Sequence, residues 1–401
     1  MVQRVEIIML KEKNKKEAQR LCHLSKNLYN AANYEMRQSF LKGKKKSNYQ
    51  ISTEFAKNNQ SDYRALPAQC SQQIINLLEK NWKSFFKIAK DRKKNPKKYK
   101  GKPKLPRYKN KDGYNVLILT SQQIGNKLTR HGFIKLPKGI GLKIKTRISL
   151  EQIQQIRIVP EATCFKCEIV YEKEVIKNEN LKVENKTSID LGVNNLATMF
   201  INDEVFSSCI INGRPLKSIN QFYNKKLASL RSFVGDKSSK RIRNFTKRRN
   251  NKVKDYIHKA SRWIINFCEN HHIGHLIIGK NDGWKQKSKM SKKVNQHFVG
   301  IPFEMLINQL IYKAEDSGIV VELTEESYTS KIDHLAGEQF GHKEKYLGKR
   351  VHRGQFKSST GKVINADVNG AIGIMRKVVG DSLVTKITDS VGAFTPVIVT
   401  L

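Results

Sequence analysis

The stretch Ser188-Ile189-Asp190-Leu191-Gly192-Val193-Asn194-Asn195 decides the fold of the second half of this 401-residue chain. It places the carboxylate of Asp190 at the end of an apolar run, and a Gly-Val-Asn-Asn turn follows directly. After this turn, the ranges 196–201 and 205–210 have the composition of two short strands separated by Asn202-Asp203. The sequence therefore predicts a three-stranded meander with an acidic residue on its first strand.

A second acidic motif lies near the C-terminus. The stretch Ile364-Asn365-Ala366-Asp367-Val368-Asn369-Gly370-Ala371 places Asp367 in the first turn of a predicted helix that continues to Met375. An aspartate there is by itself a common capping residue, and Asp190 by itself is compatible with an ordinary strand end. Together the two acids favour an RNase H-like nuclease core, whose central strand holds a divalent cation against a phosphate.

Both motifs resemble those of a known protein family. The stretch SIDLGVNNLAT resembles the first RuvC motif, and GKVINADVNGAIGIMRK resembles the third, of TnpB. TnpB, also called OrfB, is the transposon-encoded RNA-guided DNA nuclease that is the apparent ancestor of the compact type V CRISPR effectors. Other segments resemble the family in order and spacing, among them EESYTSK, NQHFVGIPFEMLINQLIYKAEDSGI and LPAQCSQQIINLLEKNWKSFFKIAKD. The resemblance covers nearly the whole chain.

The resemblance implies an α+β multidomain fold. An N-terminal β-barrel, the wedge, is expected at residues 1–15 and 105–180, and a helical recognition domain with a basic arm is expected as an insertion at 16–104. An RNase H-like (RuvC) α/β nuclease domain is expected at 181–330 and 364–401. Its basic insert at 331–363 would bind target nucleic acid.

Apolar periodicity predicts the individual elements. Helices are expected at 21–41, 67–89, 219–234, 253–267 and 303–316, the last capped by Gly318. Strands are expected at 2–10, 114–120, 133–136, 142–147, 153–159, 164–171, 275–278 and 319–323. The charged range 172–185 is expected to be a linker, and the helices at 219–234 and 253–267 are expected to flank the basic run 237–254.

Composition indicates a polyanionic partner. The chain has 76 Lys plus Arg against 35 Asp plus Glu, a formal charge of +41, far more than solubility requires. A solvated basic surface or a ribosome-associated protein is the alternative. The densest cationic stretch, 83–109, contains several breakers and is expected to be an extended arm on a phosphate backbone. The residues expected to contact nucleic acid are Lys93, Lys94, Lys97, Lys98, Lys247, Arg248, Arg249, Lys285, Gln286, Arg350 and Arg353.

The third catalytic carboxylate is expected at an unusual place. An RNase H-like site uses three acids to hold two Mg²⁺ ions about 4 Å apart. In the family, the strand equivalent to 275–278 usually ends in a glutamate, but here Gly279-Lys280 follows it. A subset of the family carries a relocated glutamate downstream, and this sequence resembles that arrangement. We therefore expect Glu326 to be the third metal ligand beside Asp190 and Asp367, with Glu325 and then Asp282 as the alternatives.

Cysteine usage predicts that the insert holds no zinc. Family members typically carry two C-x-x-C pairs there, but no cysteine lies beyond Cys268, and Cys164 and Cys167 lie in a predicted strand without a second pair. The histidines of the insert are expected to face solvent or contact phosphates; they are His334, His342 and His352. The sequence has no 18-residue apolar span, so we expect a cytoplasmic, nucleoid-associated prokaryotic protein without a membrane partner.

These features favour an RNA-guided DNA endonuclease with a metal-dependent RuvC site. Its expected partners are a guide RNA and a target double-stranded DNA, and the protein is expected to be a monomer or homodimer. A nuclease-dead RNA-guided repressor is one alternative, since the usual second-motif glutamate is missing. A guide-independent nuclease and a compact type V CRISPR effector are others. The sequence leaves the guide, the target-adjacent motif and the transposon or CRISPR context open.

Overall fold

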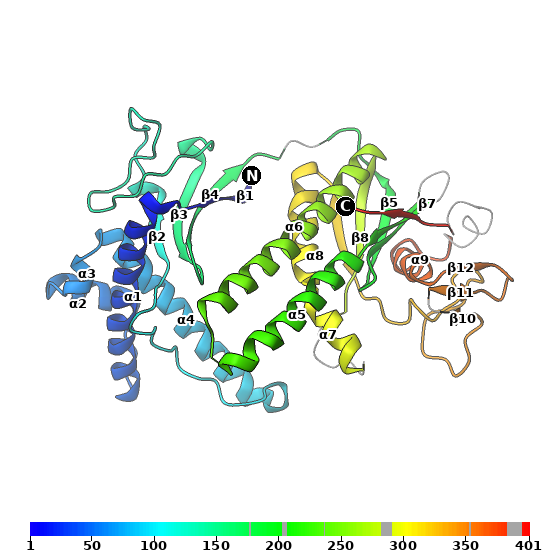
Figure 1. Cartoon of the computed structure of the whole chain (residues 1–401), viewed down its shortest axis with the longest axis horizontal. Coiled ribbons are helices and arrows are strands. Elements are labelled where there is room, and N and C mark those ends of the chain that lie inside the picture. The colour runs from blue at the N-terminus through cyan, green and yellow to red at the C-terminus, as the bar shows by residue number, and fades with distance from the viewer. Residues whose placement is uncertain (176–177, 203–206, 236, 282–290, 353, 383–394) are drawn as a thin grey trace. The chain divides into compact units, whose positions relative to one another are not determined.

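A computed structural model describes residues 1–401 except 176–177, 203–206, 236, 282–290, 353 and 383–394 (Figure 1). The chain divides into two compact units, Met1–Glu174 and Val175–Leu401. Each has its own buried apolar core. No helix among the described residues is long and apolar enough to cross a bilayer.

The first unit contains an open four-stranded sheet where a barrel was predicted. Its strands are β1 (Val2–Met9), β2 (Leu117–Thr120), β3 (Ile153–Pro160) and β4 (Phe165–Lys173). They pair antiparallel in the order β1-β4-β3-β2. The predicted strands at 133–136 and 142–147 are wrong, because only an isolated bridge between Leu128 and Ile134 forms there. Pro137 and the glycines after it interrupt a continuous ladder.

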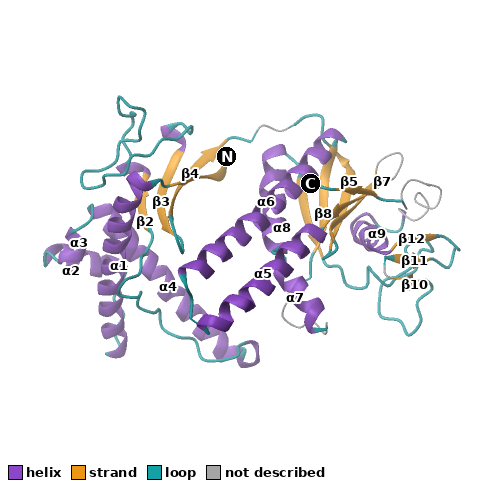
Figure 2. Cartoon of the chain, viewed as in Figure 1, coloured by secondary structure: helices purple, strands orange, loops and turns teal. Residues whose placement is uncertain are grey.

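Helices α1 (Glu12–Leu41) and α4 (Ala68–Lys94) pack against this sheet (Figure 2). The shorter helices α2 (Asn48–Lys57) and α3 (Ser61–Arg64) pack on those helices, and short 3₁₀ turns lie at Pro96–Lys98, Ser121–Gln123 and Leu150–Gln152. Helix α4 extends through the first part of the predicted basic arm, because lysine and arginine are good helix formers and suit a helix C-terminus. The rest of the arm lies along α1, where the side-chain amide of Asn33 donates to the carbonyl of Pro106 at 3.0 Å.

The second unit contains a six-stranded mixed sheet. Its strands are β5 (Lys182–Leu191), β6 (Asn195–Asn202), β7 (Ser207–Asn212), β8 (Ile273–Gly279), β9 (Val320–Thr324) and β13 (Val397–Val399), in the order β13-β7-β6-β5-β8-β9. Strands β5, β6 and β7 form the predicted antiparallel meander. Strand β8 runs parallel to β5, and β9 runs parallel to β8. Strand β5 begins at Lys182, within the range predicted as linker.

Helices α6 (Lys240–Asn270) and α8 (Phe303–Ser317) cover one face of this sheet, and α9 (Ala366–Val379) covers the other. Helix α5 (Arg214–Val234) packs against α6, and α7 (Lys292–Gly300) packs against α5. Because side chains alternate along a strand, Ile189 packs in the core shared with α6 and α8, whereas Phe200 on β6 packs with α9. The predicted basic run 237–254 is not a separate segment, since most of it forms the first turns of α6. Ser239 caps that helix through the amide of Ile242.

The range predicted as an insert folds against α9. It contains a small sheet of β10 (Lys349–His352), β11 (Gln355–Lys357) and β12 (Val363–Asn365). Apolar residues of this range, including Leu335 and Phe356, share a core with α9. The expected exposure of His334 is wrong: its ring is buried and contacts the backbone carbonyl of Thr329 at 2.8 Å.

Candidate catalytic site and nucleic-acid interface

Asp190 lies at the carboxyl end of the central strand β5, beneath helix α9. It is paired across the ladder with Thr198 on β6, so both side chains emerge on the same face of the sheet. The hydroxyl of Ser188 donates to the carbonyl of Ala371 at 2.7 Å and ties β5 to α9 on this face. A Cβ atom at Gly370 would lie 2.6 Å from Asp190 Oδ2. A side chain at residue 370 would therefore displace the carboxylate of Asp190.

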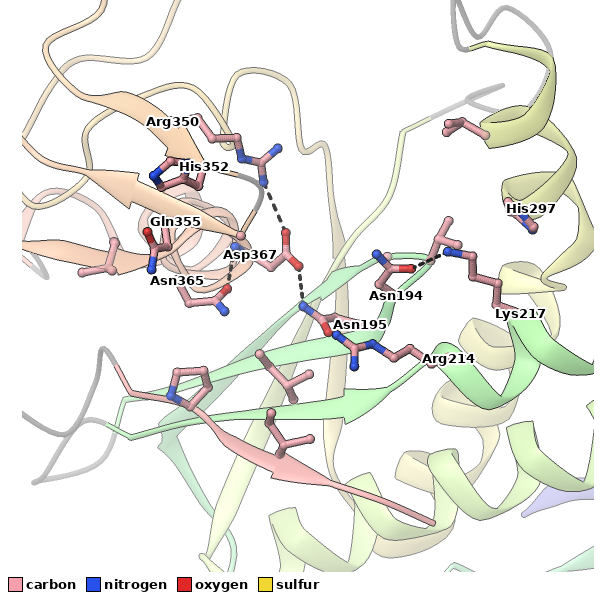
Figure 3. A pocket seen from close by; sticks show the side chains of 18 of the residues that line it. Asn194, Asn195, Arg214, Lys217, His297, Arg350, His352, Gln355, Asn365 and Asp367 are labelled. Carbon is pink, nitrogen blue, oxygen red and sulfur yellow. Dashed lines mark hydrogen bonds and ion pairs between the residues drawn. The ribbon is translucent and has the colours of Figure 1, made fainter.

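Asp367 occupies the first turn of α9, where other polar side chains hold it. Asn365 caps the helix, since its side-chain oxygen accepts from the amides of Asp367 and Val368 at 2.9 and 3.3 Å. Asn195 Nδ2 donates to Asp367 Oδ2 at 2.6 Å, and the guanidinium of Arg350 lies 3.5 Å from Oδ1 (Figure 3). The carboxylate of Asp367 thus faces the turn that follows β5 and the strand β10.

The two glutamates after β9 have different environments. Glu325 is exposed and accepts from the Ser327 hydroxyl at 2.5 Å. Glu326 is half-buried, and its backbone amide donates to Asn281 Oδ1 at 3.1 Å. A Cβ atom at Gly279 would lie 3.1 Å from Glu326 Oε2. The carboxylate of Glu326 therefore lies against the position where β8 lacks a side chain.

Electrostatics link these acids. Burial, followed by the negative charges of Glu326 and Asp367, raises the pKa of Asp190 well above its ordinary value, while Arg350 opposes the shift. Burial also raises the pKa of Glu326 to about 7, against the smaller effect of Lys377. Asp190, Glu326 and Asp367 thus bring acidic groups close together, and Arg350 and Lys377 offset their mutual repulsion only in part. Clustered carboxylate oxygens are the ligands that Mg²⁺ prefers.

The carboxylates of these acids do not converge on one metal position. Within the described part of the chain, no three His, Cys, Asp or Glu side chains converge closely enough to hold one metal ion. Asp367 is instead held by Asn195 at 2.6 Å and by Arg350 at 3.5 Å. The oxygen donors of these acids are of the chemical type that binds divalent cations.

A groove of about 1280 Å³ lies beside Asp367 (Figure 3). Its wall includes the first turn of α5, where Arg214 and Lys217 lie, and the strand β10 with Arg350 and His352. Lys217 Nζ donates to Asn194 Oδ1 at 3.3 Å. Several cations around one carboxylate suit a phosphodiester strand that passes the acidic cluster.

The expected nucleic-acid contacts fall into different environments. Lys93, Lys94 and Lys97 are exposed at the end of α4 and just beyond it, whereas Lys98 forms an ion pair with Asp91 at 2.8 Å. In the second unit, the basic stretch of α6 presents Arg248 to solvent, and Lys247 is half-buried. The expected residues Asp282, Lys285, Gln286 and Arg353 lie outside the described residues.

Arg249 has an internal role in place of the expected exposed one. Its guanidinium donates to Asn220 Oδ1 at 2.8 and 2.5 Å and to the carbonyl of Gly300 at 2.9 Å. It also lies 5.4 Å from the ring centroid of Tyr223, and burial lowers its pKa. Arg249 therefore joins α5, α6 and the end of α7.

A second carboxylate centre, which we call the Asp333 hub, organises the insert. Asp333 is fully buried and accepts from the Ser358 hydroxyl, from the Ser359 amide and hydroxyl, and from the Ala336 amide, at 2.7–3.3 Å. Glu338 accepts from the amides of Asp333 and Leu347 at 2.8 and 3.1 Å.

Buried Arg376 of α9 fastens the Asp333 hub to the helix. It donates to the carbonyls of Glu338 and Gly337 at 2.6 and 3.0 Å and pairs with Asp381 at 2.7 Å. Sequence reasoning missed the hub. The run Ser358-Ser359-Thr360 was its only signal, and these residues are distant from Asp333 in sequence.

Two family models match the sequence. The OrfB_IS605 model, described as "Probable transposase", matches residues 168–285, and the Cas12f1-like TNB domain model matches residues 303–374. The TnpB-like protein MJ0751 of Methanocaldococcus jannaschii is 25% identical over 170 residues. These residues are 41% of this chain and span 60% of that relative's length.

Solved structures are similar over almost the whole chain. The mini-RNA-guided endonuclease CRISPR-Cas_phi3 superposes with a TM-score of 0.50 at 9% identity and covers 95% of this chain and 93% of its own. This likeness shows a shared mixed α/β fold. A chain from a Cas12f1-sgRNA-target DNA complex covers 93% of this chain and 99% of its own at 17% identity, with a TM-score of 0.37. That superposition is too loose to support more detail.

Proposed function

We propose that this chain is an RNA-guided DNA endonuclease of the TnpB family, which is related to the type V CRISPR effectors. A guide RNA would select the DNA by base pairing, and the protein would hold the paired strands through their backbones. A net charge of +41 supports a polynucleotide partner. The solved structure that shares this fold at a TM-score of 0.50 is that of a mini-RNA-guided endonuclease, which supports a guide RNA as a partner here.

The observation that carries the proposal is the electrostatic cluster of Asp190, Glu326 and Asp367. Burial, together with the charges of Glu326 and Asp367, raises the pKa of Asp190, so three acids from separate parts of the sequence interact here. The absence of a side chain at Gly279 supports Glu326 as the third ligand, because its carboxylate oxygen lies 3.1 Å from where a Cβ atom of residue 279 would be. Glu325 is exposed and is the weaker candidate.

Each residue has a chemical role in this proposal. The three carboxylates would hold two Mg²⁺ ions, with Asn195 steering Asp367 through its 2.6 Å hydrogen bond. The chemistry supplied by the bound ions would be activation of the attacking water and stabilisation of the leaving oxygen. Arg214, Lys217 and Arg350 would bind the phosphates of the strand in the adjacent groove. Arg350 would exchange Asp367 for a phosphate when DNA enters.

The test starts from the wild-type protein purified with its bound RNA. Sequencing that RNA identifies the guide, and a plasmid library with matching targets then reports cleavage in Mg²⁺ and in EDTA. Guide-dependent cutting in Mg²⁺ alone supports the proposal. Tight, guide-dependent binding without cutting would instead identify a nuclease-dead repressor, and cutting without RNA would identify a guide-independent nuclease.

A further inference from the structure

The α5–α6 pair is strongly cationic beyond the first turn of α5. Between Lys225 and Lys254 the sequence contains 12 Lys plus Arg residues and one acid, Asp236. A groove of about 500 Å³ lies between the two helices. The residues lining it are Phe222, Lys226, Leu230, Lys240, Arg241, Asn244, Phe245 and Arg248. The lining therefore contains four cations and two phenylalanines but no acid, a composition that suits a polyanion with flat apolar groups.

A stack of aromatic rings runs through the base of this groove. Arg249 lies 5.4 Å from the Tyr223 ring, Tyr223 stacks on Phe245 at 5.4 Å, and Phe245 meets Phe222 edge-on at 6.0 Å. The buried hydrogen bonds of Arg249 to Asn220 anchor one end of the stack. At the other end Phe222 is 66% exposed. The stack thus holds a largely exposed ring among the cations.

We infer that this groove binds a single-stranded polynucleotide, with one unpaired base stacked on Phe222 and the flanking phosphates held by Arg241, Arg248 and the neighbouring lysines. Exposed aromatic rings bind bases that are free to unstack, and basic side chains beside them bind the backbone. A duplex offers the phosphates but keeps its bases stacked and paired, so the ring favours a single strand. The inference rests on the proposed function only in taking a nucleic acid as the partner.

The helices supply matched controls for this test. Phe233 lies on the same helix as Phe222 and is 83% exposed, but it does not line the groove. Arg243 is exposed on the same helix as Arg241 and is also outside the lining. Within each pair, the two substitutions remove the same type of exposed side chain, one inside the groove and one outside it. A difference within a pair therefore reports the groove and not the overall charge.

The first experiment is photo-crosslinking of the full-length protein in EDTA. One arm uses a 5-iodouridine-substituted RNA 12-mer and the other a 5-iododeoxyuridine DNA 12-mer, and mass spectrometry locates the crosslink. We expect a crosslink to the peptides that contain Phe222 or Phe245 in at least one arm, and the stronger arm identifies the natural strand. Crosslinks in neither arm would overturn the inference. Because no cleavage is required, this result is independent of whether the protein proves to be a nuclease.

The second experiment measures affinity for the same oligonucleotides by fluorescence anisotropy. Phe222→Ala should weaken binding about tenfold, a typical loss for one stacked base, and Phe233→Ala should leave it nearly unchanged. Arg241→Gln should weaken binding more than Arg243→Gln. Equal losses within either pair, or competition by a blunt duplex as strong as by a single strand, would mean that the surface attracts phosphates diffusely and would overturn the inference.

Discussion

Two carboxylate centres pack against helix α9, and they are built in opposite ways. At the first, Asp190 faces two other acids, and burial together with their charges raises its pKa well above the ordinary value. At the second, buried Asp333 accepts hydrogen bonds from serine hydroxyls and backbone amides, and Arg376 donates to the carbonyl of Glu338 in the same loop. Burial of a charge is costly unless donors compensate it. The Asp333 hub is complete within the protein, whereas the Asp190 cluster is where our proposal places a cation.

The largest effect should come from removing a ligand of the incomplete centre. Asp190→Ala and Asp367→Ala should each reduce guide-directed cleavage by about 10³-fold or more, because several kcal/mol of charge stabilisation would be lost. Binding of guide and target should change little, since backbone contacts elsewhere provide it. Cleavage and gel-shift assays on one substrate measure both quantities. Cutting at the wild-type rate by either variant would remove the Asp190 cluster from the mechanism.

The next effect distinguishes the two adjacent glutamates. Glu326→Gln should lower cleavage by orders of magnitude, because it removes a charged ligand beside Gly279. Glu325→Gln is the matched control and should have little effect, since that side chain is exposed and bonded to Ser327. Single-turnover rates with saturating guide complex decide between them. Equal rates for both variants would return attention to Asp282 as the third acid.

The sequence allowed the local features of this protein to be predicted, because they depend on neighbouring residues. The meander around Asp190, the helix that begins near Asp367 and the helix end at Gly318 follow from periodicity and capping. The open sheet of the first unit did not follow, because short apolar runs such as 142–147 are buried without joining a ladder. The spacing of apolar residues therefore predicts which side chains are buried more reliably than it predicts which strands pair.

Long-range contacts could not be predicted in the same way. Arg249 belongs to a basic run that predicts an exposed face, yet its partner Asn220 lies on another helix and turns it inward. Asp333 bonds with Ser358 and Ser359 across a loop whose path no local pattern encodes. The environments of Glu325 and Glu326 also depend on tertiary structure, since they differ in exposure although the residues are adjacent.

Disrupting the complete centre should cost stability. Asp333→Ala leaves buried donors of Ser358 and Ser359 without an acceptor, which should cost about 3 kcal/mol and lower the Tm of the second unit by about 6–12 °C. The matched control is Glu344→Ala, which removes an exposed acid of the same insert and should change the Tm by less than about 2 °C. Thermal unfolding followed by circular dichroism measures both. Similar shifts for the two variants would show that the hub does not hold the insert.

The incomplete centre should respond to pH and Mg²⁺ together. The pKa of Glu326 is raised to about 7 from an ordinary value of 4.5, so its contribution to the stability of the metal-free protein is present below pH 4.5 and is lost as the pH rises through about 7. Mg²⁺ needs the ionised form, so the rise in Tm on adding Mg²⁺ should be a few degrees larger at pH 8 than at pH 6. Glu326→Gln should reduce this difference, and Glu325→Gln should preserve it. An equal Mg²⁺ effect at both pH values would contradict the assignment.

The smallest expected effect is that of zinc removal, for which we predict no change. The Asp333 hub and Arg376 supply the contacts that fix the insert loop, and no cysteine lies beyond Cys268 to provide thiolates there. Elemental analysis of the protein as isolated should therefore find less than stoichiometric zinc, and a zinc-selective chelator should leave the Tm unchanged. The chelator must spare Mg²⁺, because loss of Mg²⁺ from the Asp190 cluster would lower the Tm for another reason. One tightly bound zinc per chain, with a lower Tm after its removal, would show that the hub alone is not sufficient and would direct attention to Cys164 and Cys167.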